Sequence, residues 1–74
     1  MGKCYIVNNI RKFRFHHDEM TQQQLADQVG VTRQTIAAIE AGKYSPTLEL
    51  AFRIARVFKV PLQDMFSFVI ENED

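Results

Sequence analysis

The chain contains one cysteine, Cys4, and no hydrophobic run that approaches the roughly 18 residues of a membrane-spanning helix. One cysteine excludes an internal disulfide and a cysteine-rich zinc framework, which favours a reducing compartment. The N-terminal residues lack the basic and then apolar pattern of a secretory leader, so no leader is expected. We therefore expect a cytoplasmic protein that is stabilised by its hydrophobic core.

Net charge is also absent, because nine basic residues balance nine acidic ones. The charges are unevenly distributed along the chain. Residues 1–43 carry six Lys or Arg and four acidic residues, whereas residues 44–74 carry three and five. A neutral chain can still present a basic face, so this composition permits nucleic-acid binding without demonstrating it.

Residue sets that perform catalysis or bind metal are missing. The sequence has no Ser/His/Asp set, no paired-carboxylate site and no Gly-rich phosphate loop, so no enzyme activity and no cofactor are expected. His16 and His17 are adjacent, but neighbouring side chains on a helix point in different directions, and no metal site is expected there.

The length and composition favour one small domain, residues 1–74. Hydrophobic residues make up 46% of the chain, which is enough for one modest core. A core of this size supplies roughly 3–5 kcal/mol without disulfides, metal or oligomerisation.

Three threonines are expected to cap helices, because each stands directly before a stretch with helical apolar periodicity. They are Thr21, Thr32 and Thr47. Gln24 lies three residues after Thr21, which is the spacing of a capping box. Gly30 and Gly42 are expected to end the second and third helices, since glycine readily adopts a positive φ.

The remaining helices are one from Ile10 to about His17 and a short one after Pro61, which brings the expected number to five. In the first, Ile10, Phe13 and either Phe15 or His17 are expected to face inward. The fourth helix has a wide apolar face, made of Leu48, Leu50, Ala51, Ile54, Ala55, Val57 and Phe58.

The two ends of the chain have the composition of strands. Residues 3–7 are rich in strand formers, and a second strand-like segment spans residues 67–70. Isolated strands are marginal, and these two become plausible if they pair with each other, antiparallel, beside the helices. The expected fold is mainly α, with five helices and a small two-stranded sheet.

The stretch from Gln22 to Ala41 predicts two short helices joined by a tight turn. Ala26 is small where the helices would cross, and Gly30 permits the turn. Their interface would be filled by Leu25, Val29, Val31, Ile36 and Ile39. Any αα-hairpin of a helical bundle shares this packing, but the polar run Thr32–Thr35 at the start of the second helix is typical of a helix that reads DNA.

Over about residues 8–66 these features resemble the phage repressor/Cro-type helix-turn-helix proteins, also called the Xre family. The residues that match its pattern are Thr21-Gln22, Leu25-Ala26, Gly30-Val31, Arg33-Gln34-Thr35-Ile36, Ile39-Glu40, Gly42-Lys43-Tyr44, Pro46-Thr47-Leu48 and Leu50-Ala51. The chain is most similar to the compact branch that includes the cytolysin repressor of enterococci. The resemblance implies a five-helix, lambda-repressor-like domain, paired terminal strands and a homodimer. One residue more than usual lies between Arg14 and Thr21.

The resemblance also implies how DNA would be bound, with the third helix in the major groove. Arg33 is expected to contact guanine and Gln34 adenine, each through two hydrogen bonds, and Thr35 and Ala37 to touch thymine methyl groups. The expected phosphate contacts are Gln22, Thr32, Lys43 and Tyr44. Two alternatives stay open: Arg33 contacts only phosphate, and Tyr44 packs on its own loop.

The family often pairs an arginine of the first helix with the glutamate that ends the third, which implies an ion pair between Arg14 and Glu40. The alternative is two solvated charges. A symmetric dimer would bring two recognition helices to successive major grooves, about 34 Å apart. Its interface is expected at the hydrophobic residues near the C-terminus, unless these only close the core of the monomer: Leu62, Met65, Phe66 and Phe68.

The sequence thus predicts a sequence-specific regulator of transcription that binds double-stranded DNA, as a homodimeric repressor of a palindromic operator. A repressor is favoured because a dimer bound over a promoter blocks polymerase without further domains. The alternative is a protein-binding module of the same fold, such as an antitoxin with an unknown protein partner. The tail Glu71–Asp74 is short for wrapping such a partner.

Overall fold

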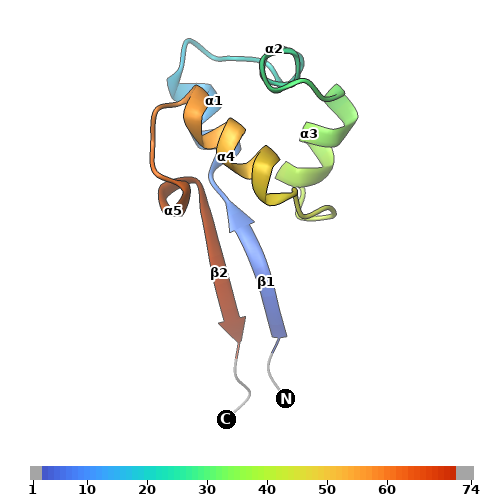
Figure 1. The fold of residues 1–74 in the computed structure, drawn as a ribbon, viewed down its shortest axis with the longest axis vertical. Helices are drawn as coiled ribbons and strands as arrows, with labels where there is room; N and C mark the ends of the chain where they lie inside the picture. The colour runs from blue at the N-terminus through green and yellow to red at the C-terminus, as the bar shows by residue number, and fades with distance from the viewer. Residues whose placement is uncertain (1–2, 72–74) are drawn as a thin grey trace.

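The computed structural model describes residues 3–71; residues 72–74 of the tail lie outside this range. Within it lie β1 (Lys3–Asn8), α1 (Ile10–His16), α2 (Gln22–Val29), α3 (Arg33–Glu40), α4 (Leu48–Val57), α5 (Leu62–Met65) and β2 (Phe66–Glu71). The helices pack together, and the paired strands project from them as a ribbon (Figure 1). The predicted fold class, five helices with a terminal two-stranded sheet, is confirmed.

Threonine caps determine where three of the helices begin. The hydroxyl oxygen of each predicted cap accepts a hydrogen bond from the backbone N–H three residues later, at Thr21, Thr32 and Thr47. At α2 the Gln24 side chain also accepts from the backbone N–H of Thr21 at 2.8 Å, which completes the capping box. These local contacts satisfy N–H groups that a helix start leaves without partners.

The turn between α2 and α3 is tight because Gly30 adopts a φ of +79°, a conformation that side chains disfavour. Helix α4 supports this turn from the side. Its Arg53 donates from Nη1 to the carbonyl oxygen of Val29 at 3.5 Å and also pairs with Glu49 at 2.6 Å. The helix-turn-helix unit is therefore held by α4 as well as by its own packing.

All five helices contribute to one core, whose large, fully buried side chains are Ile10, Leu25, Ile36, Ile39, Ile54 and Met65. Met65 corrects a prediction. Its side chain is 0% exposed within one chain, so it fills the core and is not available to a dimer interface. Leu48 was expected in the core but is 67% exposed, because the helical rotation carries it off the stripe formed by Leu50 and Ile54.

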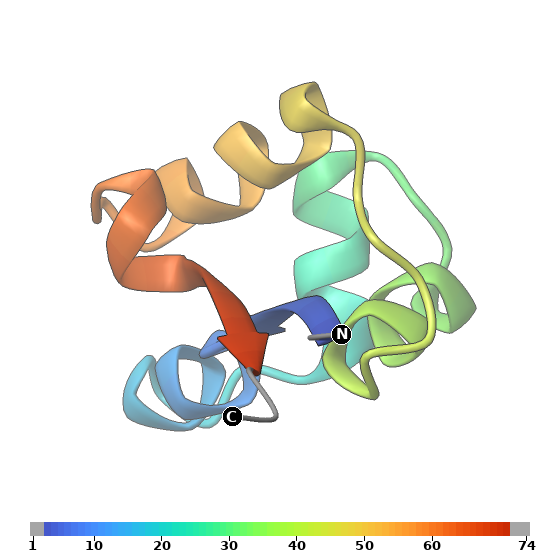
Figure 2. The same ribbon diagram turned by 90° about the horizontal axis from the view of Figure 1, so that it is seen from below.

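The terminal strands pair antiparallel over six residues each, from Lys3 opposite Glu71 to Asn8 opposite Phe66. The predicted pairing is confirmed, with strands slightly longer than expected. A side-chain hydrogen bond of 3.1 Å from the Tyr5 hydroxyl to Glu71 raises the pKa of Tyr5. The ribbon makes the molecule elongated, 42 × 22 × 21 Å, and the helices surround its base (Figure 2).

Two asparagines attach the base of the ribbon to the helices. The amide nitrogen of Asn8 donates to the carbonyl oxygen of Ile39, in the last turn of α3, at 2.9 Å. The side-chain oxygen of Asn8 accepts from the backbone N–H of Ile10, the first residue of α1, at 3.1 Å. The backbone N–H of Asn9 donates to the carbonyl oxygen of Met65 at 2.9 Å. The ribbon is thus hydrogen-bonded to α1, α3 and α5.

The connection between α1 and α2 contains two consecutive residues in the left-handed region, Asp18 with a φ of 54° and Glu19 with a φ of 52°. α1 ends at His16, and the chain turns back so that the N–H of Met20 donates to the carbonyl oxygen of Arg14 at 2.9 Å. Side chains with a Cβ disfavour this region, so the connection is locally strained.

Replacing Glu19 by glycine is expected to stabilise the protein. A residue with a Cβ in the left-handed region costs about 1–2 kcal/mol of stability, which glycine avoids. Glycine also has more freedom in the unfolded chain, and this offsets roughly 0.5–1 kcal/mol of the gain. Glu19→Gly should therefore raise the free energy of unfolding in urea by about 0.5–1 kcal/mol at a fixed chain concentration. Glu19→Ala is the control, since it keeps the Cβ; equal stability of the two variants would contradict the prediction.

Candidate nucleic-acid interface

α3 buries one side and exposes the other. Ile36 and Ile39 are buried in the core. Because a helix turns about 100° per residue, the opposite side carries the exposed Gln34 and then only alanines. These alanines are Ala37, Ala38 and Ala41. Small side chains on this side let another surface approach the helix backbone closely.

The N-terminal end of α3 combines exposed polar groups with a helix cap. The side chains of Arg33 and Gln34, in the first turn, are exposed. The Thr32 hydroxyl accepts from the backbone N–H of Thr35 at 3.2 Å, and the two threonine hydroxyl oxygens are 3.0 Å apart. The hydroxyl of Thr35 is therefore engaged with the cap, which leaves its methyl group for outside contacts.

The C-terminal end of α3 is joined to α1 and α2 by one hydrogen-bonded network. Arg14 donates from Nε to Glu40 at 2.6 Å and from Nη2 to the same carboxylate at 3.0 Å, with side chains only 15% and 10% exposed. Its Nη1 donates to the carbonyl oxygen of Met20 at 2.7 Å. Gln22, the first residue of α2, donates from Nε2 to Glu40 at 3.2 Å. Arg14 and Glu40 thus form a mostly buried ion pair.

The loop after α3 carries two further predicted contact residues, and both are exposed. The backbone N–H of Lys43 donates to the carbonyl oxygen of Ala38 at 2.9 Å, which holds the loop against the helix. Tyr44 is 47% exposed and, together with Thr35 and Thr47, lines an open hollow of about 320 Å³. The structure therefore brings Thr35 and Tyr44 to the same part of the surface.

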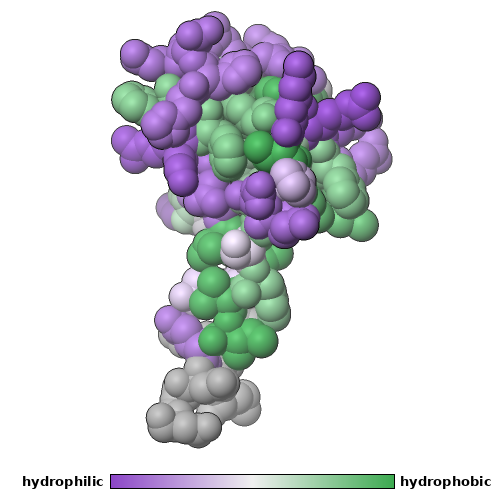
Figure 3. Space-filling model, turned by 90° about the vertical axis from the view of Figure 1, so that its left-hand side faces the viewer, coloured by the Kyte–Doolittle hydropathy of each residue, from purple (hydrophilic) through white to green (hydrophobic). Residues whose placement is uncertain are grey.

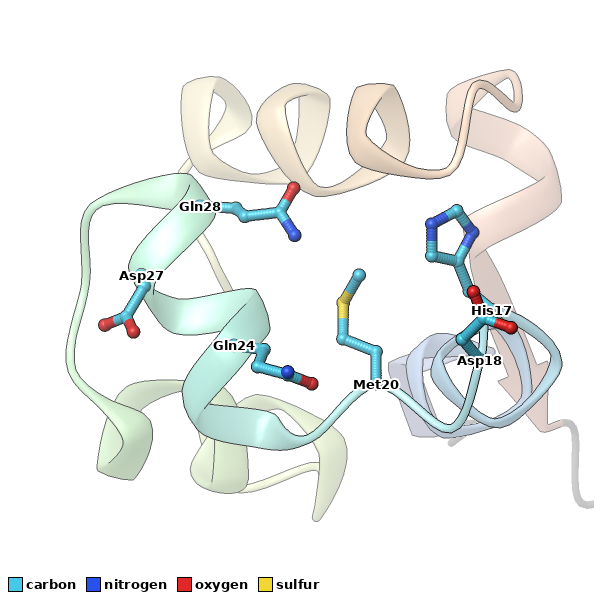
Figure 4. A pocket seen from close by; sticks show the side chains of 6 residues that line it. All are labelled: His17, Asp18, Met20, Gln24, Asp27 and Gln28. Carbon is cyan, nitrogen blue, oxygen red and sulfur yellow. The ribbon is translucent and has the colours of Figure 1, made fainter.

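A second open hollow, of about 410 Å³, lies between the end of α1 and α2 (Figure 4). It is lined by Met20 and by residues of both segments, among them Asp18 and Gln24. No three His, Cys, Asp or Glu side chains of the described residues gather in a way that could hold a metal ion. Across residues 3–71, the helices are also too short or too polar to cross a bilayer.

The ribbon carries an exposed hydrophobic patch. Ile6 pairs with Phe68 across the two strands, and Ile70 follows on the same side, with exposures of 40%, 64% and 57%. Ile6 and Phe68 also line an open hollow of about 250 Å³ with Leu62 and Phe66. We call these five residues the ribbon patch. Hydrophobic side chains cover much of the ribbon in Figure 3.

Three of the four residues predicted for a dimer interface lie in the ribbon patch, namely Leu62, Phe66 and Phe68. The fourth, Met65, lies in the core. Sequence reasoning missed Ile6 and Ile70. Their alternation along strand-like segments was a usable signal, but which side they share with Phe68 depends on the pairing register.

Comparison with known proteins gives consistent matches. The profile of the helix-turn-helix family matches residues 10–65. An uncharacterized HTH-type transcriptional regulator of Archaeoglobus fulgidus is 52% identical over 59 residues, which are 80% of this chain and 83% of that protein. The cryptic phage CTXphi transcriptional repressor of Vibrio cholerae is 33% identical over 67 residues, 90% of this chain and 60% of that repressor. The crystal structure of a candidate DNA-binding protein from Bacteroides fragilis shares the fold, with a TM-score of 0.72, 22% identity and coverage of 84% and 98% of the two chains.

The ion pair at the end of α3 predicts unequal effects of single and paired substitutions. Arg14→Met leaves the mostly buried carboxylate of Glu40 without its cation, and it should lower the free energy of unfolding by about 3 kcal/mol. Arg14→Met combined with Glu40→Met removes both charges, and it should lower the free energy of unfolding by no more than about 1 kcal/mol. Urea unfolding measures both, and equal losses for the two variants would contradict the prediction.

Proposed function

The chain belongs to the helix-turn-helix family of DNA-binding transcriptional regulators, and from this premise we propose that it is a homodimeric repressor of a palindromic operator. Its relatives are named as transcriptional regulators, so we propose no enzyme activity. One observation carries the proposal. The Asn8 side chain joins the ribbon, which bears the ribbon patch, to α3, which bears the exposed polar and alanine side, by a hydrogen bond to Ile39.

In the proposed complex α3 lies in the major groove. Arg33 and Gln34 are exposed in its first turn, so their side chains are free to reach guanine and adenine edges. Ala37 is small and lies on the same side of the helix, where it permits close approach and contact with a thymine methyl group. The methyl group of Thr35 is a further candidate, because its hydroxyl takes part in the cap.

Phosphates of the DNA backbone are proposed to contact both ends of α3 and the start of α2. Thr32 precedes α3, and Lys43 and Tyr44 follow it in an exposed loop. Gln22 stands at the N-terminus of α2, where unpaired N–H groups and the helix dipole favour an anion. Such contacts fix the orientation of the protein on the duplex, and base contacts then supply specificity.

Dimerisation is proposed to occur through the ribbon patch. A symmetric dimer buries the same surface of both chains, so one hydrophobic patch is enough to form the interface. A projecting ribbon with exposed Ile6, Phe68 and Ile70 favours such an association. Because Asn8 links the ribbon to α3, a dimer formed there would also fix the separation of the two recognition helices.

Repression follows from occupancy in this proposal. A dimer that covers a promoter blocks polymerase directly, and no additional domain is needed. The similarity to a phage transcriptional repressor supports this choice over activation.

Base reading by Arg33 predicts a selective loss. After preferred sites have been selected from random DNA, Arg33→Ala should reduce the preference for them by about 1–3 kcal/mol per half-site, with a smaller loss on random DNA. Arg56→Ala removes an exposed arginine in the last turn of α4 and is the matched control. Equal losses of Arg33→Ala on both DNAs would assign Arg33 to phosphate contact.

The same titrations at increasing salt test whether DNA is bound through phosphates. Arg33 and Lys43 give two exposed cations per chain at the proposed interface. Four cations in a dimer predict that log Kd rises with log salt with a slope of about 3–4. A dissociation constant that does not change with salt would refute the proposed DNA interface.

The ribbon patch predicts where a substitution separates the dimer. Phe68→Ser combined with Ile70→Ser should convert the dimer to monomers in sedimentation velocity and retain the helical circular dichroism, because both side chains are more than half exposed. Phe52→Ser is the matched control, since Phe52 is 53% exposed on α4, away from the ribbon. A double variant that remains dimeric at the same concentration would place the interface elsewhere.

A further inference from the structure

We propose that Glu40 is a positioning residue for DNA binding. Its carboxylate, held by Arg14, orients the side-chain amide of Gln22 so that this amide can donate to a backbone phosphate. The inference rests on the proposed function, in which Gln22 contacts phosphate.

The orientation of Gln22 follows from one hydrogen bond. Its Nε2 donates to Oε1 of Glu40 at 3.2 Å, across 18 residues of sequence, and its side chain is half-buried. A side-chain amide nitrogen carries two hydrogens, so one N–H is used and a second remains for an outside acceptor. A donor that is already oriented loses less conformational freedom on binding than a freely rotating one.

Glu40 can hold this amide because it is itself fixed. Arg14 binds the carboxylate through two nitrogens, at 2.6 and 3.0 Å. The third nitrogen of the guanidinium donates to the carbonyl oxygen of Met20 at 2.7 Å, two residues before Gln22. One arginine therefore fixes both the acceptor of the Gln22 amide and the backbone that leads into α2.

The charge of the pair is suited to an anion nearby. An unpaired Glu40 carboxylate beside Gln22 would repel a phosphate, and its 10% exposure leaves little solvent to screen the repulsion. The guanidinium of Arg14 cancels that charge in a two-nitrogen contact. The pair thus supplies an acceptor for Gln22 without a net negative charge.

The neighbouring Gln23 provides an internal comparison. Its Nε2 donates to Asp27 at 2.8 Å, four residues along the exposed surface of α2. This contact lies within one helix and does not join α2 to α3. Gln23→Met therefore removes a similar hydrogen bond without touching the proposed positioning network.

The test is a mutant cycle on the full chain with the selected operator. Gln22→Met should weaken operator binding about tenfold, as expected for the loss of one hydrogen bond to a charged group. Arg14→Met with Glu40→Met should give a similar loss, although its fold is retained. Adding Gln22→Met to that pair should cause no further loss, and Gln23→Met should bind like the unmodified chain.

Rescue by a conservative variant separates positioning from a purely structural role. Arg14→Met with Glu40→Gln restores an amide oxygen that accepts from Gln22, whereas methionine at position 40 offers no such acceptor. The glutamine version should recover part of the tenfold loss at equal unfolding free energy, because the acceptor is restored but is no longer held by Arg14. Equal affinities of the glutamine and methionine versions would overturn the inference.

The remaining outcomes distinguish the phosphate contact of Gln22 from the positioning role of Glu40. Full affinity of Gln22→Met would overturn the phosphate contact assigned to Gln22 in the proposed function. A loss with Gln22→Met but full affinity of the Arg14/Glu40 pair variant, or additive losses in the triple variant, would overturn only the positioning role.

If the pair variant does not fold, NMR of the unmodified chain decides. Slower exchange of the Gln22 side-chain amide hydrogens than of those of the exposed Gln34 supports the inference, and equal exchange overturns it.

Discussion

The last turn of α3 is where hydrogen bonds from three other parts of the chain meet. Asn8 of β1 donates to the carbonyl oxygen of Ile39, while Arg14 of α1 and Gln22 of α2 donate to the carboxylate of Glu40. Polar groups with little exposure contribute modestly to stability, because desolvation offsets their attraction, but they favour one geometry over others. The placement of α3 relative to the ribbon and to α2 therefore depends on two consecutive residues.

Much of the fold could be predicted because its signals are local. A threonine before an apolar-periodic stretch caps a helix through atoms three residues away, so Thr21, Thr32 and Thr47 mark helix starts wherever the helices later pack. Gly30 marks the turn for a similar reason, since its positive φ is a property of one residue. The pairing of the chain ends was implied by the family resemblance, and it agrees with the marginal stability of isolated strands.

The remaining features depend on packing between distant segments, which periodicity does not determine. Met65 and Phe68 are both hydrophobic and three residues apart, yet one is fully buried and the other is 64% exposed. The end of a short helix and the start of the ribbon separate them, and only the folded arrangement decides which faces the core. The contact between Gln22 and Glu40 is similar, because no pattern over 18 residues reveals that two helix ends meet.

Neutral overall charge makes this placement important for the proposed DNA binding. Among the described residues, Arg14 and Arg53 form ion pairs within the chain, which leaves fewer cations for phosphates. Counterion release grows with the number of such cations, so the contribution that is independent of sequence is small here. Affinity then depends more on neutral amides, such as that of Gln22 proposed for a phosphate and that of Gln34 proposed for adenine, which act only within hydrogen-bond distance. For a regulator of this composition, the geometry set at the last turn of α3 therefore matters more for the proposed DNA binding than the net charge of the protein does.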